Sequence, residues 1–436
     1  MTLQPRMREY GRRLTAFFCA DKQTLKIVGF MALLQVLGII AGLTIFPHGY
    51  AYQHVPLFHK LITWDGLQYM TIATHGYNGD LNYCALHYCN IAFFPLQGMI
   101  DKLIIFIFGL GASFFFIFLA SWCLGLLSIF FFARLARDIL GDHARNAIFL
   151  YALYPAAAFY LMGYPVGLLS ILIILTWHRA IQGKWWQAAL CVGIGSATAP
   201  MMVFIGLPVG VYYLFHQLKH GKFPLSVLQI GGWAVLALSG LILFMIFQYF
   251  ALGTALAFII GQQPWGGGHP SFMAKIERLT TFRWYLGFYN ETIGWALQNN
   301  IHLINIPPND LILFQNIKMH PADFFEFIFQ SIANLIFFAL ALAGVVLAWF
   351  FCKPMNAKLI ICASGCCALF GYMWFMLATD QGMTSTIRLI FPAVSMFFGL
   401  GGISSRFKAL EYVLFPAFTL CSFIEVAYVV SGFSVT

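Results

Sequence analysis

The sequence predicts an all-α polytopic membrane protein, on the basis of its composition and of the apolar segments that recur along it. The 436 residues are 61% hydrophobic and 9% charged, and the mean hydropathy is +0.81. Soluble domains are nearer to about half apolar and about a quarter charged. No polar tract is long enough for a separate soluble domain. We therefore expect a single transmembrane domain over residues 1–436.

Eleven apolar segments are candidate membrane spans, since a spanning helix needs about 20 apolar residues. They lie at about 27–46, 112–133, 146–162, 165–181, 186–201, 203–217, 226–252, 327–351, 358–377, 388–404 and 410–431. The fifth and sixth are short and fit a tight hairpin broken near Pro200. The first apolar run is too long for a signal-peptide core, which predicts an uncleaved first helix.

The distribution of Lys and Arg predicts the orientation. Seventeen of the 24 lie in the basic N-terminal segment and in short loops on the same side, and seven lie on the other side. By the positive-inside rule, the N-terminus is cytoplasmic and the C-terminus faces outward. This also explains the formal net charge of +9 without a nucleic-acid partner. The sequence predicts a multi-pass protein of a bacterial inner membrane or the endoplasmic reticulum membrane.

Two predicted exported loops are long, 47–111 and 253–326, whereas the cytoplasmic loops are short. Both long loops are rich in aromatic residues, which favours helices lying along the membrane interface. Most ionisable side chains outside the basic loops gather there, so we place the functional site on the exported (periplasmic or lumenal) face. No nucleotide-binding or zinc-protease motif of a soluble enzyme is found.

One stretch of the first exported loop carries a recognisable motif. It runs from Trp64 to Gly76, with the sequence WDGLQYMTIATHG, and continues through Tyr77 to the FFP segment at 93–95. It resembles the signature of the PIG-V-like (GPI mannosyltransferase 2) family, written roughly WD-x-x-x-[YF]-x-x-IA-x-x-GY and followed by FFP. The resemblance implies a GT-C membrane glycosyltransferase that uses a polyprenyl-phosphate sugar, with mannose as the expected sugar and an unidentified acceptor.

Asp65 is the candidate catalytic base, because sugar transfer to a hydroxyl requires a group that accepts the acceptor's proton. The alternative is a helix cap or a solvated loop acid. The family resemblance favours the base, and a single base activating the acceptor for in-line attack implies inversion at the sugar. Trp64, Gln68 and Tyr69 are expected to line the substrate site. His75 either binds a sugar hydroxyl or phosphate, or is an interfacial histidine without a catalytic part.

Arg388 is the candidate phosphate ligand, since a guanidinium offers a planar fork that matches phosphate oxygens. It opens an apolar segment as R-x-x-x-P, which is typical of the family; the alternative is an arginine that snorkels at the membrane edge. Asp380 could pair with Arg388 or contact the substrate. Gln262 and Arg283 are weaker candidates, supported mainly by their place in the second long loop.

Asp80 and two cysteines complete the candidates in the first loop. Asp80 is either a second functional acid or part of the Asn-Gly-Asp turn at 78–80. Cys84 and Cys89 are the cysteines in a predicted exported loop, where they could form a disulfide or stay reduced. Most of the other cysteines are expected to act as small apolar residues within spans.

The sequence departs from the family pattern in two places. Val166 and Gly167 occupy a region where members tend to have an acid, and Ala199 stands where arginine is usual. These departures leave open a non-catalytic lipid-phosphate-binding protein, and a lipid-linked substrate transporter or flippase is the alternative from another class. We expect no metal and no cofactor, with membrane lipids and a small membrane subunit as candidate partners.

Overall fold

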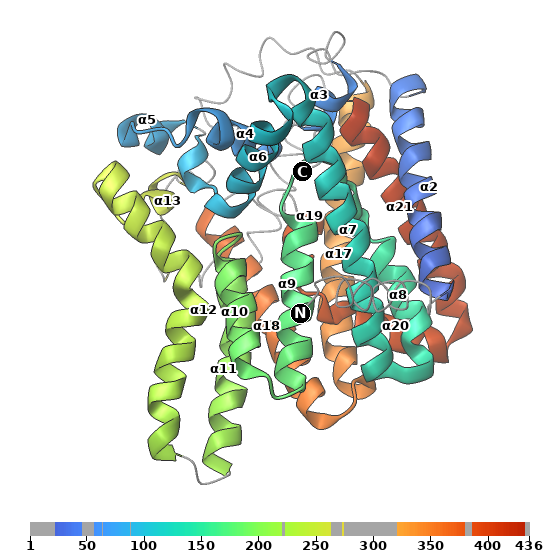
Figure 1. Cartoon of the computed structure of the whole chain (residues 1–436). Helices are drawn as coiled ribbons and strands as arrows, with labels where there is room; N and C mark the ends of the chain where they lie inside the picture. Colours follow the sequence, from blue (N-terminus) through green and yellow to red (C-terminus); the bar gives the residue numbers. More distant parts are fainter. Residues whose placement is uncertain are drawn as a thin grey trace, which may run out of the picture.

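The computed structural model describes residues 22–45, 56–62, 64–87, 89–219, 223–262, 273, 321–379 and 386–431. Across these ranges the chain folds into helices, without a strand (Figure 1). Seven helical segments are long and apolar enough to cross a membrane, or eight if the bent pair Pro155–Leu161 and Val166–Ile181 is one span. The predicted all-α polytopic class is confirmed.

The long helices form a bundle whose neighbours are often distant in sequence. α2 packs against α21, α7 against α9, α10 against α12, and α11 against α18. Their bounds are α2 Lys22–Thr44, α7 Leu110–Leu140, α9 Val166–Ile181, α10 Trp185–Ser196, α11 Met201–Lys219, α12 Phe223–Leu252, α17 Pro321–Phe351, α18 Met355–Thr379 and α21 Lys408–Ser431. Most of these helices run along a common direction (Figure 1).

Two of the eleven predicted spans are broken. The segment 146–162 is divided into α8 (Ala144–Ala152) and the 3₁₀-helix η4 (Pro155–Leu161). The segment 388–404 is divided into α19 (Thr386–Leu389) and α20 (Ser395–Arg406). A proline lies at each break, Pro155 or Pro392, and its missing N–H cannot continue an α-helical ladder.

The fifth predicted span, 186–201, is also too short to cross a membrane on its own. α10 ends at Ser196 after 12 residues, and α11 begins at Met201. The break predicted near Pro200 is therefore confirmed. Another turn lies between η4 and α9, which meet at 117°. Gly163 has a φ of +69° there, and Pro165 disfavours helical backbone at the residue before it.

The first predicted exported loop folds into short helices at one end of the bundle (Figure 1). They are α3 Leu57–Leu61, α4 Asp65–His75, α5 Leu81–Leu86, η2 Asn90–Ala92 and α6 Pro95–Phe108. Of the second predicted loop, the structure describes α13 (Ala257–Ile260) with its flanking residues and the start of α17. In the described residues, α4 and the other short helices therefore lie together at one end of the bundle.

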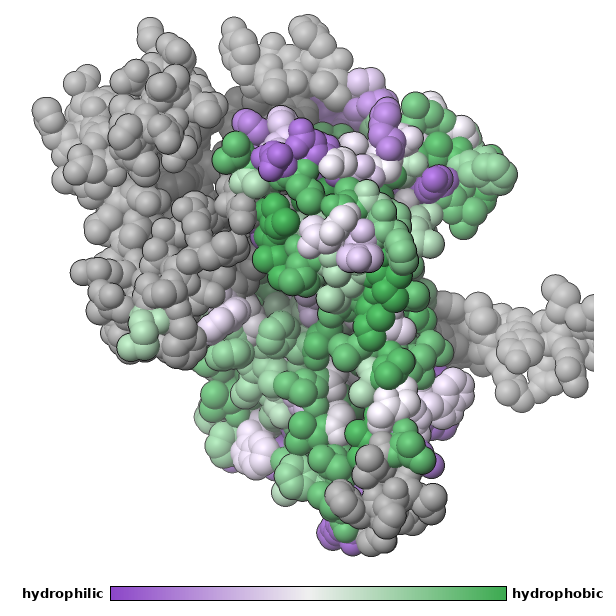
Figure 2. Space-filling model, turned by 90° about the vertical axis from the view of Figure 1, so that its left-hand side faces the viewer, coloured by the Kyte–Doolittle hydropathy of each residue, from purple (hydrophilic) through white to green (hydrophobic). Residues whose placement is uncertain are grey.

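Polar and apolar residues are segregated along the bundle. Figure 2 shows a broad hydrophobic band on this face, with hydrophilic residues gathered toward the two ends. The end opposite α4 carries basic residues at the ends of successive helices, among them Arg137, Arg179, Lys219, Lys353 and Arg406. An apolar band between polar ends, with basic residues at one of them, is the pattern expected of a membrane-spanning bundle.

A buried acid lies where α6 packs on α4. Gly98 of α6 is in such close contact with Ile72 of α4 that a Cβ at this position would overlap the isoleucine side chain. One turn further on, Asp101 is 1% exposed, and Gln97 donates a hydrogen bond from Nε2 to Asp101 Oδ1 at 2.8 Å. Burial raises the pKa of Asp101 to about 8, while the hydrogen bond from Gln97 acts in the opposite direction.

We predict that Asp101 makes the protein less stable as pH rises. Its pKa of about 8 in the folded state compares with an ordinary value of about 3.9, so between these values the unfolded chain releases a proton that the folded chain keeps. Asp101→Asn should therefore raise the melting temperature in detergent at pH 8 and change it little at pH 4. Asp142→Asn, at an exposed position, is the control. Melting curves whose difference stays constant from pH 4 to pH 8 would contradict the prediction.

Candidate active site

Asp65 and Arg388 are 323 positions apart in the sequence and meet in the folded protein. Arg388 Nη1 donates to Asp65 Oδ2 at 2.6 Å, and the two side chains are 19% and 27% exposed, respectively. A charge-assisted hydrogen bond in a partly dehydrated place is among the stronger polar contacts in proteins. The candidate base and the candidate phosphate ligand thus belong to one site, in which both side chains are partly exposed.

The start of α4 holds Asp65 in place. The acid is in the first turn of the helix, where the positive end of the helix dipole favours a carboxylate. The preceding Trp64 has a φ of +52°, a conformation that costs of the order of 1–3 kcal/mol for a residue other than glycine. Gly66 lies directly against the carbonyl oxygen of Met162, with no room for a side chain. Close packing therefore fixes the helix start against the η4–α9 turn.

The η4–α9 turn supplies two aromatic rings to the site. Arg388 Cζ lies 5.2 Å from the ring centre of Tyr164 and 5.4 Å from that of Phe159, and the two rings meet edge to face at 5.3 Å. A cation at this distance from an aromatic face is attracted by about 0.5–2 kcal/mol. The hydroxyl of Tyr164 also accepts a hydrogen bond from the backbone N–H of Asp65 at 3.0 Å.

Arg388 is carried by a short helix that is fixed at both ends. The buried Asn334 of α17 accepts a hydrogen bond from the backbone N–H of Ile387 at 3.2 Å. At the other end, the N–H of Phe391 donates to the carbonyl of Arg388 at 3.2 Å. The ring of Phe391 stacks on Tyr154. These contacts restrict where the guanidinium can lie.

The electrostatics of the site keep Arg388 charged and Tyr69 neutral. Burial by itself lowers the pKa of Arg388, but the negative charge of Asp65 raises it, and the net shift is upward. Tyr69 is 7% exposed; burial raises its pKa first, and the charge of Asp65 adds to the effect. At neutral pH the site therefore presents a guanidinium and a phenol as hydrogen-bond donors beside one carboxylate.

The other candidates of the first loop lie at different distances from this pair. Trp64 is adjacent to Asp65 and exposed, and Gln68 is one turn further along α4 and half-buried. His75 ends the helix, about 15 Å away at 1.5 Å per residue, and its Nδ1 is hydrogen-bonded to the hydroxyl of Thr74 at 2.7 Å. The structure therefore brings Trp64, Gln68 and Tyr69, but not His75, near the ion pair.

Asp80 caps a helix. Its Oδ1 accepts a hydrogen bond from the N–H of Tyr83 at the start of α5 at 3.0 Å, and its own N–H donates to Asn78 Oδ1 at 3.0 Å. The turn interpretation of this acid is the one that the structure supports. Among the described residues, no three His, Cys, Asp or Glu side chains gather as a metal-ligand set.

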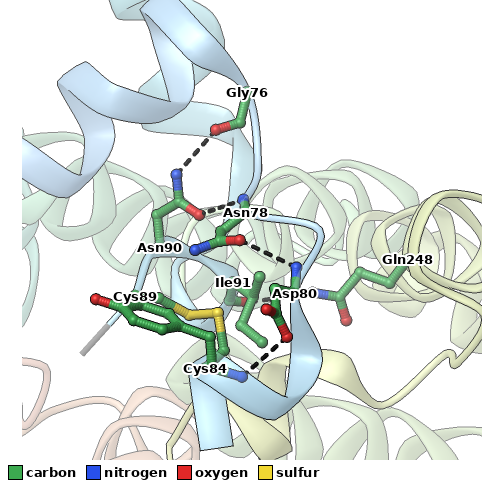
Figure 3. The surroundings of a disulfide bond; sticks show 9 residues. Gly76, Asn78, Asp80, Cys84, Cys89, Asn90, Ile91 and Gln248 are labelled. Atoms are coloured by element: carbon green, nitrogen blue, oxygen red, sulfur yellow. Dashed lines mark hydrogen bonds between the residues drawn. A yellow bond between two sulfur atoms is a disulfide. The ribbon is translucent and has the colours of Figure 1, made fainter. Parts of the chain in front are cut away.

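Cys84 and Cys89 are joined by a disulfide (Figure 3). Beside the disulfide, the side chain of Asn90 binds the backbone that follows α4. Its Oδ1 accepts a hydrogen bond from the N–H of Asn78, and its Nδ2 donates to the carbonyl of Gly76, each at 2.9 Å. Gln248 of α12 donates from Nε2 to the carbonyl of Ile91 at 3.1 Å. These bonds attach the segment after α4 to the bundle.

The remaining candidates do not reach the ion pair in the described residues. Gln262 follows α13, which packs on η2 and α5 near the disulfide. Arg283 and Asp380 lie outside the described residues. Ala199 is in the break between α10 and α11 and is half-buried. Gly167 lies against the backbone of α7 at Gly125, so a side chain at this position would collide with the neighbouring helix.

The aromatic cradle, which we define as Phe159 and Tyr164, was missed by the sequence analysis. Both residues are buried in a segment that was predicted to lie at the edges of two spans. The available signal was the Gly163-Tyr164-Pro165 triplet, which predicts a turn rather than a continuous helix. A turn at this point can present a side chain to another element.

Comparisons with known proteins place few constraints on this site. No model of a known protein family matches the chain, and no curated protein matches its sequence. Among solved structures, an apo-form oligosaccharyltransferase from Archaeoglobus fulgidus is similar, with 13% identity and a TM-score of 0.47. The match covers 96% of this chain and 57% of that one, so this chain spans little more than half of its length. A likeness this distant does not assign a function, which must be argued from the site.

We predict that the contact at Gly66 is essential for the placement of α4. Gly66→Ala would push a methyl group into the Met162 carbonyl, and such overpacking costs about 1–3 kcal/mol. The melting temperature should fall clearly. Gly79→Ala is the matched control, because nothing lies within 4 Å of a Cβ built there. Equal melting temperatures of the two variants would show that α4 tolerates displacement.

Proposed function

We propose that this protein is a GT-C-like membrane glycosyltransferase that transfers a sugar, with mannose the first candidate, from a polyprenyl-phosphate donor to an acceptor hydroxyl. The observation that carries the proposal is the ion pair between Asp65 and Arg388. It joins the acid of the family-like motif to the arginine of the R-x-x-x-P element at one exposed end of a transmembrane bundle. The resemblance to PIG-V-like enzymes is part of this proposal, and so is inversion at the sugar, which follows from a single base that activates the acceptor for in-line attack.

The two charges suit the two halves of such a reaction. A carboxylate that accepts the proton of the attacking hydroxyl makes the oxygen a better nucleophile. A guanidinium that binds the leaving phosphate stabilises the negative charge developing there. Asp65 and Arg388 are in direct contact, so a donor with its phosphate on Arg388 would place its sugar within reach of Asp65.

The ion pair also implies an exchange of partners. While Arg388 Nη1 donates to Asp65 Oδ2, this carboxylate oxygen is occupied by the guanidinium and is not free to accept the proton of an attacking hydroxyl. A donor phosphate competes with Asp65 for the same guanidinium. We propose that donor binding releases the carboxylate, so that the base becomes fully active only when the donor is in place.

We propose that the site faces the periplasm or the lumen. Among the described residues, the basic residues at the end of the bundle opposite α4 support this orientation, since cytoplasmic ends are enriched in Lys and Arg. A polyprenyl-phosphate sugar presents its headgroup at the membrane surface, and α4, which begins with Asp65, lies among the short helices at the end of the bundle (Figure 1).

A lipid-linked substrate transporter is the second candidate. Its support is Glu425 of α21, which is 2% exposed and whose Oε2 has no hydrogen-bond partner among the residues that the structure describes. Ionisable groups inside spans are typical of transport pathways. Purified protein in detergent separates the two functions when a membrane-lipid extract is added as the source of acceptor hydroxyls. A transferase then moves the label from radiolabelled polyprenyl-phosphate mannose to an acceptor and releases polyprenyl phosphate, whereas a transporter leaves the donor unchanged.

Asp65→Asn should separate chemistry from binding. Loss of the base predicts a fall in turnover of about 10²–10⁴. Affinity for polyprenyl phosphate should rise, because Arg388 no longer has a competing carboxylate. Turnover is measured with the radiolabelled donor and affinity by native mass spectrometry. Asp142→Asn, at the opposite end of the bundle, should behave as the wild type. Near-normal turnover of Asp65→Asn would remove the base assignment.

Arg388→Lys tests the fork geometry. Lysine keeps the charge but loses the planar pair of donors, so affinity for polyprenyl phosphate should fall, and Arg388→Ala should lower it further. Arg145→Lys is the matched control, since Arg145 forms a 3.8 Å ion pair with Glu411 at an exposed place. If Arg388→Ala binds the phosphate lipid as tightly as the wild type, Arg388 is not the phosphate ligand.

A further inference from the structure

We propose that Tyr164 is a positioning residue that sets the geometry between the base and the phosphate ligand. This inference rests on the proposed function for its catalytic meaning, and on the structure alone for its contacts. Tyr164 touches both partners of the ion pair: its hydroxyl accepts the N–H of Asp65 at 3.0 Å, and its ring centre is 5.2 Å from Arg388 Cζ.

The hydroxyl contact acts on α4. The first N–H groups of a helix have no partner within the helix, and that of Asp65 is satisfied by a side chain from the η4–α9 turn instead of by a capping residue. The preceding Trp64 provides no side-chain cap. The Tyr164 hydroxyl thus fixes the first residue of α4, which is the residue that bears the candidate base.

The ring contact acts on Arg388. Once a donor phosphate displaces Asp65, the guanidinium loses its anionic partner and must stay where the phosphate needs it. The two rings of the aromatic cradle contact the guanidinium directly and not through the Asp65 carboxylate, so they can hold the cation before and after the exchange. Tyr164 is 5% and Phe159 2% exposed, which excludes water from this face of the guanidinium and strengthens the attraction.

The turn that carries Tyr164 is rigid, as a positioning residue requires. Gly163 has a φ of +69°, a Cβ at this position would lie only 3.1 Å from the Ile117 side chain of α7, and Pro165 fixes the backbone on the other side. Tyr164 therefore projects from a turn with little freedom, and it transmits a fixed position to two elements, α4 and α19, that are far apart in the sequence.

Two substitutions separate the two contacts. Tyr164→Phe keeps the ring and removes the hydroxyl, so turnover should fall at least tenfold while the affinity for polyprenyl phosphate stays within about threefold of the wild type. Tyr164→Leu removes both contacts, so affinity should fall as well, by at least tenfold. Tyr160→Phe is the matched control: it is a fully buried tyrosine of the same segment, and its hydroxyl contacts Ser128 at 3.4 Å. It should leave turnover and affinity unchanged.

A double-variant comparison tests the inference without any substrate. Tyr164→Leu and Arg388→Gln are made singly and together, and the three melting temperatures are compared with that of the wild type. If the side chains interact, the double variant should lose less than the sum of the single losses. Additive losses would overturn the inference, as would wild-type turnover in Tyr164→Phe. If the wild type binds no polyprenyl phosphate, the proposed function fails, and this comparison alone decides the role of Tyr164.

Discussion

The site depends on one electrostatic constraint, which is that Arg388 must be neutralised where little water reaches it. A charge removed from water is costly unless it is paired and hydrogen-bonded. Asp65 supplies the opposite charge at 2.6 Å, and the rings of Phe159 and Tyr164 cover part of the guanidinium. Because the partners come from α4, α19 and the η4–α9 turn, this one requirement ties together three elements from the first half and the end of the chain.

The rest of the bundle serves this arrangement through close packing and local polar bonds. Gly66 lets α4 approach the carbonyl of Met162, and Asn334 holds the start of α19 through the N–H of Ile387. The Cys84–Cys89 disulfide and the bonds of Asn90 fix the segment after α4. Each contact restricts the movement of an element that carries a candidate functional side chain, and such restriction keeps the geometry of a site constant.

The departures from the family pattern have different structural settings. At Gly167, α9 crosses the backbone of α7 so closely that any side chain would overlap Gly125, so the acid that family members carry in this region could not be added at this position without moving a helix. Ala199 is different, because it lies in the break between α10 and α11 and is half-buried, and nothing in the described structure explains why an alanine stands where the PIG-V-like pattern has an arginine. Arg388 is therefore the phosphate ligand on which the proposal relies.

Composition and local pattern by themselves determined the membrane class, the position of most helices and the break near Pro200, and the resemblance to the PIG-V-like motif made Asp65 and Arg388 functional candidates. These properties depend on features that lie close together in the sequence, namely the length of an apolar run, a proline or the Trp-Asp motif. They can therefore be predicted without knowledge of the tertiary structure. Tertiary structure alone decided that Asp65 and Arg388 touch, that Asp80 caps α5, that His75 lies far from the pair, and that Tyr164 contacts both partners. Such relations depend on how helices distant in sequence cross. The prolines at 155 and 392 indicate the two broken spans. Hydropathy alone predicts a continuous helix through both positions, because it does not take into account the hydrogen bond that a proline cannot donate.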